Sequence, residues 1–333
     1  MEQPFPKPQD KYPVVYLKDT DLVLPSNAVN NGLRYGYFKT IAKGGKCIIQ
    51  SCNDFHLSRV VAHKSLRPEL ADDPHEQQRF LREARVTAMM QHPNTIPIYE
   101  LGRDSSSNYF FTMKLVEGAT LGEVRNGEAE VDDWFSSTLG RQIDVLIQVC
   151  HALHYAHNHG VVHRDVKPAN ILLGPFGEVL LLDWGLAKVW GMAADEAGVE
   201  TDLPATREAS LTGDSKLQGT VFYMSPEQIK ESDDLDHRAD IYSLGAVLYE
   251  VLTGEEMIYR APLHAMLTSV LEAEIDLPRE RAPDRNIPEA LEEICLRCIA
   301  RNPDDRYQSA NDLLEALQYW SDGSHRRRSS DSL

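Results

Sequence analysis

The sequence predicts an α+β protein of two lobes: a small, strand-rich first lobe with one main helix, and a larger, mostly helical second lobe. Short apolar runs interrupted by glycine fill residues 34–115, and only one helix-length pattern lies among them. Long amphipathic segments dominate residues 116–320. The chain has 333 residues, which is enough for two lobes around a sizeable core.

The first lobe is predicted to hold five strands and one helix. The apolar spacing over residues 75–91 predicts a helix that carries Glu83 and that Pro93 ends. In one alternating run, Ala62 and Lys64 share a face. Strands are expected within residues 34–49, where a glycine pair separates two of them, and over 59–66, 96–102 and 109–116.

The second lobe is predicted to be built mainly of helices. Gly160 is expected to cap the first of them. Two short strands joined by the turn GPFG should precede a loop-like stretch, residues 186–218, which is long enough to be either functional or disordered. The expected helices cover 141–158, 239–252, 262–272, 288–299 and 310–320, and the two strands cover 171–173 and 179–182.

Both ends of the chain are predicted to lie outside the lobes. Residues 1–33 are rich in Pro, Asp and Asn, so we expect an extended arm with a short strand at Val14–Leu17. The polar residues 321–333 predict a disordered tail. No run of about 18 apolar residues is present, so no membrane span is predicted.

Charge and cysteine content exclude some classes of function. The 34 basic and 51 acidic residues give a net charge of −17, which disfavours binding to nucleic acid or to an anionic membrane. Five cysteines form an odd, sparse set, which indicates reduced thiols and a cytoplasmic protein. Cys295 and Cys298 form a CxxC that could bind a metal or act as a redox pair. Core packing is favoured, because the surrounding run is apolar and no second pair lies nearby.

The most informative motif is HRDVKPAN at residues 163–170. The carboxylate of Asp165 can accept a hydroxyl proton, and the ammonium of Lys167 can neutralise phosphate charge. The amide oxygen of Asn170 can bind Mg²⁺. The alternative interpretation is a polar loop that has this pattern by chance.

Two weaker motifs acquire meaning beside it. Asp183 follows an apolar strand and precedes Trp184 and Gly185, so its carboxylate could bind Mg²⁺; alone, this triplet is more often a simple turn. Lys64 lies on the inward face of a predicted strand, with Glu83 available as a partner on the next helix. Taken alone, each of these charges is usually a surface residue.

Together these motifs resemble the protein kinase superfamily, most closely the eukaryotic-like Ser/Thr kinases of bacteria. The sequences FLREARVTAMMQHPNTIPIYELG and RADIYSLGAVLYEVLTG resemble that group throughout, and the resemblance covers residues 34–320. It implies the bilobal protein-kinase fold, with lobes at 34–115 and 116–320. It also implies transfer of the γ-phosphate of ATP, with Mg²⁺, to serine and threonine hydroxyls of protein substrates.

The resemblance assigns roles to individual residues. Asp165 matches the catalytic base, Lys167 the residue that steadies the transferred phosphate, and Thr220 the threonine that helps to hold them. Asn170 and Asp183 match the Mg²⁺ ligands.

The nucleotide site is implied in the same way. Lys64, paired with Glu83, matches the anchor of the α- and β-phosphates. Met113 matches the gatekeeper. The rest of the implied ATP site consists of the ring-contacting residues Ala62 and Leu172, the hinge residues Lys114–Val116, and Ala42, Gly44, Cys47 and Ile49 of the glycine-rich turn.

Three structural matches complete the set. Glu227, in the Ser-Pro-Glu motif, and Arg306 match the buried ion pair of the large lobe. Asp240 matches the residue that anchors the backbone of the catalytic loop. Arg164 matches an arginine that in this family often meets a phosphate on the activation loop.

The glycine-rich turn departs from the family pattern GxGxxGxV. Only Gly44 of the three glycines is present, with Ala42 and Cys47 at the other two positions. We expect weaker or slower use of ATP and not its loss, because the main electrostatic groups remain. Cys47 could be a redox handle, although a tolerated substitution is the favoured interpretation.

Activation by autophosphorylation at Thr212 or Ser215 is a further hypothesis. Its basis is Arg164 beside a long, hydroxyl-rich loop, and the alternative is a flexible loop with incidental hydroxyls. For the whole chain, an active Ser/Thr kinase is the main hypothesis, and the alternative is a pseudokinase scaffold with a degraded nucleotide turn. A kinase of small molecules is disfavoured by Thr220 and the Ser-Pro-Glu motif.

Overall fold

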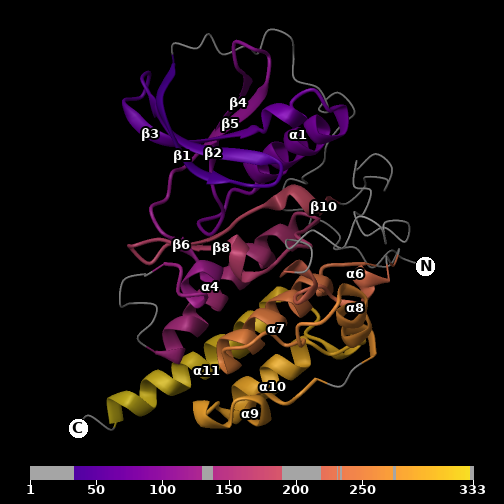
Figure 1. Cartoon of the computed structure of the whole chain (residues 1–333). Coiled ribbons are helices and arrows are strands. Elements are labelled where there is room, and N and C mark those ends of the chain that lie inside the picture. Colours follow the sequence, from indigo (N-terminus) through magenta and orange to yellow (C-terminus); the bar gives the residue numbers. More distant parts are fainter. Residues whose placement is uncertain are drawn as a thin grey trace.

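The computed structural model describes residues 34–129, 138–189, 219–230, 232, 235–272 and 275–330. The described residues form the two predicted lobes, with a strand-rich lobe above a helical one in Figure 1. The predicted arm with its strand at Val14–Leu17, most of the predicted loop 186–218, and Thr212 and Ser215 lie outside the described residues.

A five-stranded antiparallel sheet forms most of the first lobe. The strand order is β1-β2-β3-β5-β4, which leaves β1 and β4 at the edges. The strands predicted over 96–102 and 109–116 are observed over 98–103 and 109–113, and the backbone N–H of Lys114 donates to Pro97 O just beyond them. The strands are β1 (Tyr35–Lys43), β2 (Cys47–Asp54), β3 (Arg59–Leu66), β4 (Ile98–Arg103) and β5 (Tyr109–Met113).

Helix α1 (Pro74–Met89) packs against this sheet. Asp73 caps its N-terminus by accepting hydrogen bonds from the backbone N–H groups of His75 and Glu76, at 2.9 and 3.3 Å. The apolar face buries Phe80, whose ring lies 5.1 Å from that of Phe111 on β5. The predicted helix is therefore confirmed, and its position brings Glu83 to the sheet.

The second lobe is helical around a single large core. Helix α7 is buried on nearly its whole surface, and α4, α10 and α11 pack around it. Cys295 and Cys298 lie fully buried within this core, which supports the core-packing interpretation of the CxxC. The long helices are α4 (Leu139–Asn158), α7 (Arg238–Thr253), α8 (Leu263–Glu272), α10 (Glu289–Cys298) and α11 (Ala310–Ser330).

Short elements at the junction of the lobes carry the residues of interest. They make a three-stranded sheet, β6-β8-β9, and a two-stranded sheet, β10-β7. The strands are β6 (Ala119–Thr120), β7 (Val161–Val162), β8 (Ile171–Leu173), β9 (Val179–Leu181) and β10 (Lys188–Val189). The short helices are not confined to this junction: they are α2 (Leu121–Arg125), α6 (Pro226–Ile229) and α9 (Pro278–Arg281), with 3₁₀ turns at 68–70, 168–170, 184–186, 283–285 and 303–305.

The C-terminal end corrects one prediction. Residues 321–333 were expected to be a disordered tail, but α11 continues through Ser321 to Ser330. Ser321 is buried, and its hydroxyl donates to Asp144 on α4 at 3.3 Å. Because a docked helix adds residues without a new nucleation step, the polar sequence continues the helix beyond the contact.

Candidate active site

The loop at residues 163–170 brings an acid and a base into contact. It lies between β7 and β8, and its last residues form the 3₁₀ turn at 168–170. The ammonium of Lys167 lies 2.7 Å from both carboxylate oxygens of Asp165 and 3.0 Å from the hydroxyl of Thr220. The structure thus gathers three residues for which the resemblance implies different catalytic roles, and Thr220 is 53 positions from Lys167 in the chain.

Asn170 contacts the same carboxylate. Its side-chain N–H₂ donates to the backbone carbonyl and to a carboxylate oxygen of Asp165, at 2.8 and 2.9 Å. Burial raises the pKa of Asp165, the charge of Lys167 opposes this, and Asp183 adds to it, so that the net pKa lies above the ordinary value. A carboxylate with a raised pKa, held at both oxygens, is suited to accept a proton from a hydroxyl group.

Asp240, in the first turn of α7, binds the backbone of the loop at residues 163–170. Its carboxylate accepts hydrogen bonds from the backbone N–H groups of His163 and Arg164, both at 2.8 Å, and contacts the ring of His157 at 2.8 Å. Burial raises the pKa of Asp240. The hydrogen bonds and the charges of the two histidines lower it by more, so the net pKa lies below the ordinary value. These bonds let Arg164 keep a left-handed backbone conformation, with φ at 69°.

Lys64 and Glu83 form an ion pair between β3 and α1. The ammonium lies 2.5 Å from the carboxylate, and both side chains are largely buried. Burial lowers the pKa of Lys64, but Glu83 and then Asp183 raise it more, so the lysine stays charged. A buried ammonium next to an acid is a fixed positive charge inside the molecule.

Asp183 lies just after β9, at the start of the 3₁₀ turn at 184–186. It adopts the left-handed region, with φ at 63°, and its carboxylate accepts from Gly185 N at 3.3 Å. A side chain at Gly185 would put its Cβ 3.1 Å from that carboxylate oxygen, so glycine suits the position. Burial raises the pKa of Asp183, but the charges of Lys64 and Lys167 lower it by more. The carboxylate is therefore held ionised.

The donor set fits a hard divalent cation. Asn170 and Asp183 supply amide and carboxylate oxygens, and the backbone next to them is joined because Leu182 N donates to Asn170 O at 2.8 Å. Within the described ranges no group of three His, Cys, Asp or Glu side chains could hold a metal. A cation of the magnesium type requires only one or two protein oxygens, since waters and substrate phosphates complete its shell.

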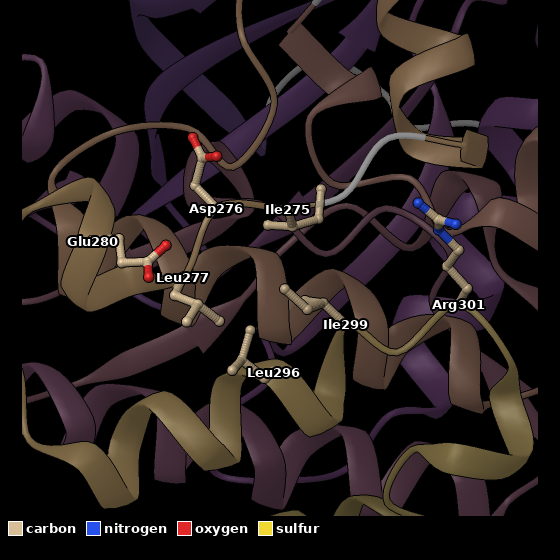
Figure 2. A pocket seen from close by; sticks show the side chains of 7 residues that line it. All are labelled: Ile275, Asp276, Leu277, Glu280, Leu296, Ile299 and Arg301. Carbon is tan, nitrogen blue, oxygen red and sulfur yellow. The ribbon is translucent and has the colours of Figure 1, made fainter.

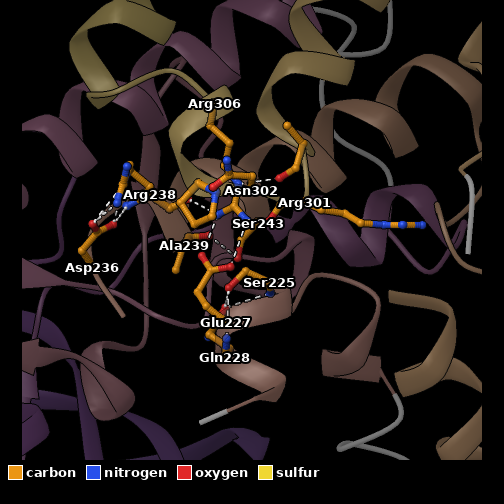
Figure 3. A network of polar contacts seen from close by, with 12 residues as sticks. Ser225, Glu227, Gln228, Asp236, Arg238, Ala239, Ser243, Arg301, Asn302 and Arg306 are labelled. Atoms are coloured by element: carbon orange, nitrogen blue, oxygen red, sulfur yellow. Dashed lines mark hydrogen bonds and ion pairs between the residues drawn. The ribbon is translucent and has the colours of Figure 1, made fainter. Parts of the chain in front are cut away.

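Glu227 and Arg306 form a buried, two-pronged ion pair in the second lobe (Figure 3). Their two contacts are 2.6 and 2.9 Å, and Arg306 also donates to backbone carbonyls of Arg238, Ala300 and Arg301. The pair joins α6 to the turn after α10. All the donors of the guanidinium group thus have acceptors, as a buried arginine requires.

Gln228 is a site residue that sequence reasoning missed. Its side-chain N–H₂ donates to the backbone carbonyl of Arg164 at 2.7 Å, and its carbonyl oxygen accepts from Ser225 N at 3.1 Å. The Ser225–Gln228 spacing is a capping box, a signal that was readable in the sequence. The long-range contact to the loop at residues 163–170 was not, because 64 residues separate the partners.

The predicted nucleotide wall lies on β1, β2, β3 and β5. Ala62 pairs with Met113, and Ala42 pairs with Ile49 across the glycine-rich turn. Gly44 N donates to Cys47 O at 2.8 Å and closes this turn. Leu172 lies on β8. Val116 and Lys114 follow β5, and the N–H of Lys114 is already used by Pro97 O.

Cys47 does not have the properties of a reactive thiol. Burial raises its pKa to about 11, with Lys64 opposing and Glu83 adding to the shift. The thiolate is the reactive form, and little of it exists at neutral pH with such a pKa. The structure therefore favours the tolerated substitution over a redox handle.

A separate pocket lies away from these residues, between residues 275–280 and the end of α10 (Figure 2). Its volume is about 480 Å³. None of the predicted site residues is among its lining residues, which are Ile275, Asp276, Leu277, Glu280, Leu296, Ile299 and Arg301.

Comparison with known proteins agrees with this geometry. The family model described as "Protein kinase domain" matches residues 35–318. The chain is 35% identical over 300 residues to the serine/threonine-protein kinase PknD of Protochlamydia amoebophila, a match that covers 87% of this chain and 30% of that protein. It is 33% identical over 317 residues to the PknD of Chlamydia trachomatis serovar D, covering 87% and 32% of the two chains.

The chain thus spans about a third of the length of these relatives. Among the helices of the described residues, none combines the length and the apolar character needed to span a bilayer.

Proposed function

Because this chain belongs to the protein kinase domain family, we propose that it is an active serine/threonine protein kinase. Members of the family use ATP with a divalent metal ion, and their substrates are proteins. Mg²⁺ as the metal and serine and threonine as the acceptors are parts of the proposal. So is a cytoplasmic location, which the five free cysteines support.

The observation that carries the proposal is the contact of Lys167 with both Asp165 and Thr220. It places a proton acceptor and a fixed cation side by side, as transfer of a phosphoryl group to a hydroxyl requires. The hydroxyl proton of the substrate passes to Asp165, and the hydroxyl oxygen forms the new bond to phosphorus. The bond between that phosphorus and the bridging oxygen breaks, and ADP leaves. Lys167 stabilises the charge on the transferred group.

The remaining roles follow from position and charge. Lys64, held by Glu83, would bind the α- and β-phosphates, and Asn170 and Asp183 would hold the cation. The cation, when bound, neutralises phosphate charge. The adenine ring would lie between Ala62 and Leu172, next to the gatekeeper Met113, with the hinge at Lys114–Val116 as its hydrogen-bonding partner.

A catalytic role is favoured over a pseudokinase scaffold. The scaffold hypothesis rests on Ala42 and Cys47 in the glycine-rich turn. However, the acid, both lysines and both oxygen ligands are present, and their contacts support catalysis. The altered turn should weaken ATP use without abolishing it.

Activation by phosphorylation is also proposed, with Thr212 or Ser215 as the modified residue. Arg82 of α1 is buried, and its guanidinium feels the charge of Arg164: burial first, and then that charge, lower the pKa of Arg82 to about 10. The Nε of Arg164 is buried and has no hydrogen-bond partner among the described residues. Two guanidinium groups whose charges act on each other favour binding of a phosphate.

Phosphate incorporation by the purified chain with Mg·ATP tests the activity. We expect transfer to serine and threonine in a generic protein substrate, and its loss in Asp165→Asn with the melting temperature unchanged. Asp284→Asn, an exposed change of the same kind, serves as the control. A thermal shift with ATP but no incorporation by the wild type would select the scaffold, and wild-type turnover in Asp165→Asn would refute the assignment.

Alanine at both Thr212 and Ser215 tests the activation hypothesis. We expect lower activity and the loss of one phosphopeptide. Alanine at Thr201 and Thr206, in the same stretch, provides the control. Unchanged activity and unchanged phosphopeptide maps in the first variant would reject the two sites while leaving the kinase proposal in place.

A further inference from the structure

Strand β1 is an exposed edge with an irregular centre. It is the first strand in the order β1-β2-β3-β5-β4, so among the described residues only β2 pairs with it. The pairing of Gly36 with Asn53 is followed by that of Lys39 with Ser51, which leaves Tyr37 and Phe38 opposite one residue. This is a β-bulge, a feature that redirects side chains and bends the strand.

The bulge presents aromatic side chains to solvent at a conformational cost. Tyr37 adopts the left-handed region, with φ at 57°, although it is not a glycine. It is 80% exposed and Phe38 is 47% exposed. Backbone strain of this kind persists where the surroundings or a function require it, and burial within the described residues does not explain it here.

The bulge continues into a larger apolar surface, which we call the β1 ridge: Tyr37, Phe38, Phe55 and Leu57. The rings of Tyr37 and Phe55 meet edge to face at 5.8 Å, and Phe38 packs on His63 at 5.2 Å. Phe55 and Leu57, in the turn between β2 and β3, are 49% and 58% exposed. Several large apolar side chains exposed on neighbouring strands and turns favour a site of interaction.

The chain enters the sheet at the end of this ridge. Arg34 O accepts from Phe55 N at 2.8 Å, and the guanidinium of Arg34 is paired with Asp54 and Glu100. Arg34 is therefore held next to Phe55. Whatever precedes it in the chain starts within reach of the ridge.

The preceding residues have the composition to cover it. Two apolar runs, Val14–Leu17 and Leu22–Leu24, are separated by Lys-Asp-Thr-Asp. The nine residues 25–33 can span up to roughly 30 Å when extended, so the runs can reach all of the ridge. The first run is rich in β-branched and aromatic residues, which favour pairing with a free strand edge.

We propose that residues 14–24 of this chain dock on the β1 ridge and cover the free edge of β1. The apolar runs bury Tyr37, Phe38, Phe55 and Leu57, and extended backbone in the first run supplies partners for the unpaired groups of the edge. Charge agrees with this occupant, because Asp19 and Asp21 lie between the runs while the exposed Lys39 and Lys43 flank the ridge.

Docking there acts on the nucleotide turn. Strand β1 leads directly into the turn from Ala42 to Cys47, which retains only one of the three family glycines. A covered β1 holds one side of this turn in place. This consequence rests on the proposed kinase function, whereas the docking itself does not.

Hydrogen–deuterium exchange of the full chain tests the docking. The test variant is Val15→Asp with Val23→Asp, and the control is Phe5→Asp with Val29→Asp, which adds the same charge to the same arm outside the two runs. We expect residues 35–43 to exchange about tenfold faster in the test variant than in the wild type or the control. Phe55→Ser should in turn speed exchange in residues 14–24.

Equal exchange of residues 35–43 in the wild type and the test variant would refute the proposal. Protection that rises with protein concentration, together with a dimer in light scattering, would also refute it, because a second copy would then cover the ridge. Neither measurement uses phosphoryl transfer. A failed docking test is thus distinct from a failed kinase test.

Discussion

The side-chain N–H₂ of Gln228 donates to the backbone carbonyl of Arg164 at 2.7 Å, which ties the first turn of α6 to the loop at residues 163–170. Arg164 has a left-handed backbone, and its N–H is held from the other side by Asp240 at 2.8 Å. The peptide groups on both sides of this residue therefore have fixed partners. The position of Asp165, the next residue, depends on contacts from two helices of the second lobe.

Gln228→Glu isolates this contact. A glutamate keeps an acceptor for Ser225 N, so the capping box survives, but it cannot donate to Arg164 O. Loss of one hydrogen bond of about 1.4 kcal/mol predicts a kcat about tenfold lower. Steady-state kinetics measures the effect, and the melting temperature should fall by only a few degrees. An unchanged kcat would show that the bond does not position the loop.

Lys167→Met should change the pH dependence of activity. The pKa of Asp165 is raised by burial, lowered by Lys167 and raised by Asp183. Because only the ionised carboxylate accepts a proton, activity rises with pH through this pKa. Removing the lysine removes the lowering effect, so the acidic limb should move to higher pH, with a lower plateau.

The control for this change is Lys167→Arg. It keeps the positive charge, so the acidic limb should stay near that of the wild type. Profiles of kcat between about pH 5 and pH 8 provide the measurement. A limb that stays in place in the methionine variant would exclude Asp165 as the group that titrates.

Glu227→Gln should destabilise the second lobe strongly. It leaves the guanidinium of Arg306 buried without its carboxylate, which costs about 3–5 kcal/mol. Urea unfolding measures the loss. Glu289→Gln breaks an exposed pair with Arg279 and should change the free energy of unfolding by less than about 1 kcal/mol. Similar losses in both variants would contradict the buried character of the first pair.

Ala42→Gly should not improve ATP use. Ala42 lies in the β1 ladder opposite Ile49 and is not among the described residues with positive φ. A glycine there adds freedom that the fold does not use, at a cost of about 0.5–1 kcal/mol of stability. The KM for ATP and the melting temperature test this. A large fall in KM would mean that the missing glycine at this position limits nucleotide binding.

The predictions from sequence succeeded where the signal was local. The helix that carries Glu83 follows from its apolar spacing and from Pro93, and the strand with Lys64 from its alternation. The end of α11 was predicted wrongly, because its polar residues continue a helix that packing of Ser321 on α4 supports. Short helices such as α6 were missed, since four residues give too little periodicity to detect.

The sequence by itself determined the family, the two-lobed fold and the chemical types present: acids, lysines and an amide at spacings that predict phosphoryl transfer. Their roles remain predictions. Only the tertiary structure decided which groups meet, such as Lys167 with Thr220 and Gln228 with Arg164. The physical reason is distance along the chain. A contact between residues 53 or 64 positions apart depends on how helices and loops pack, and no local pattern records that.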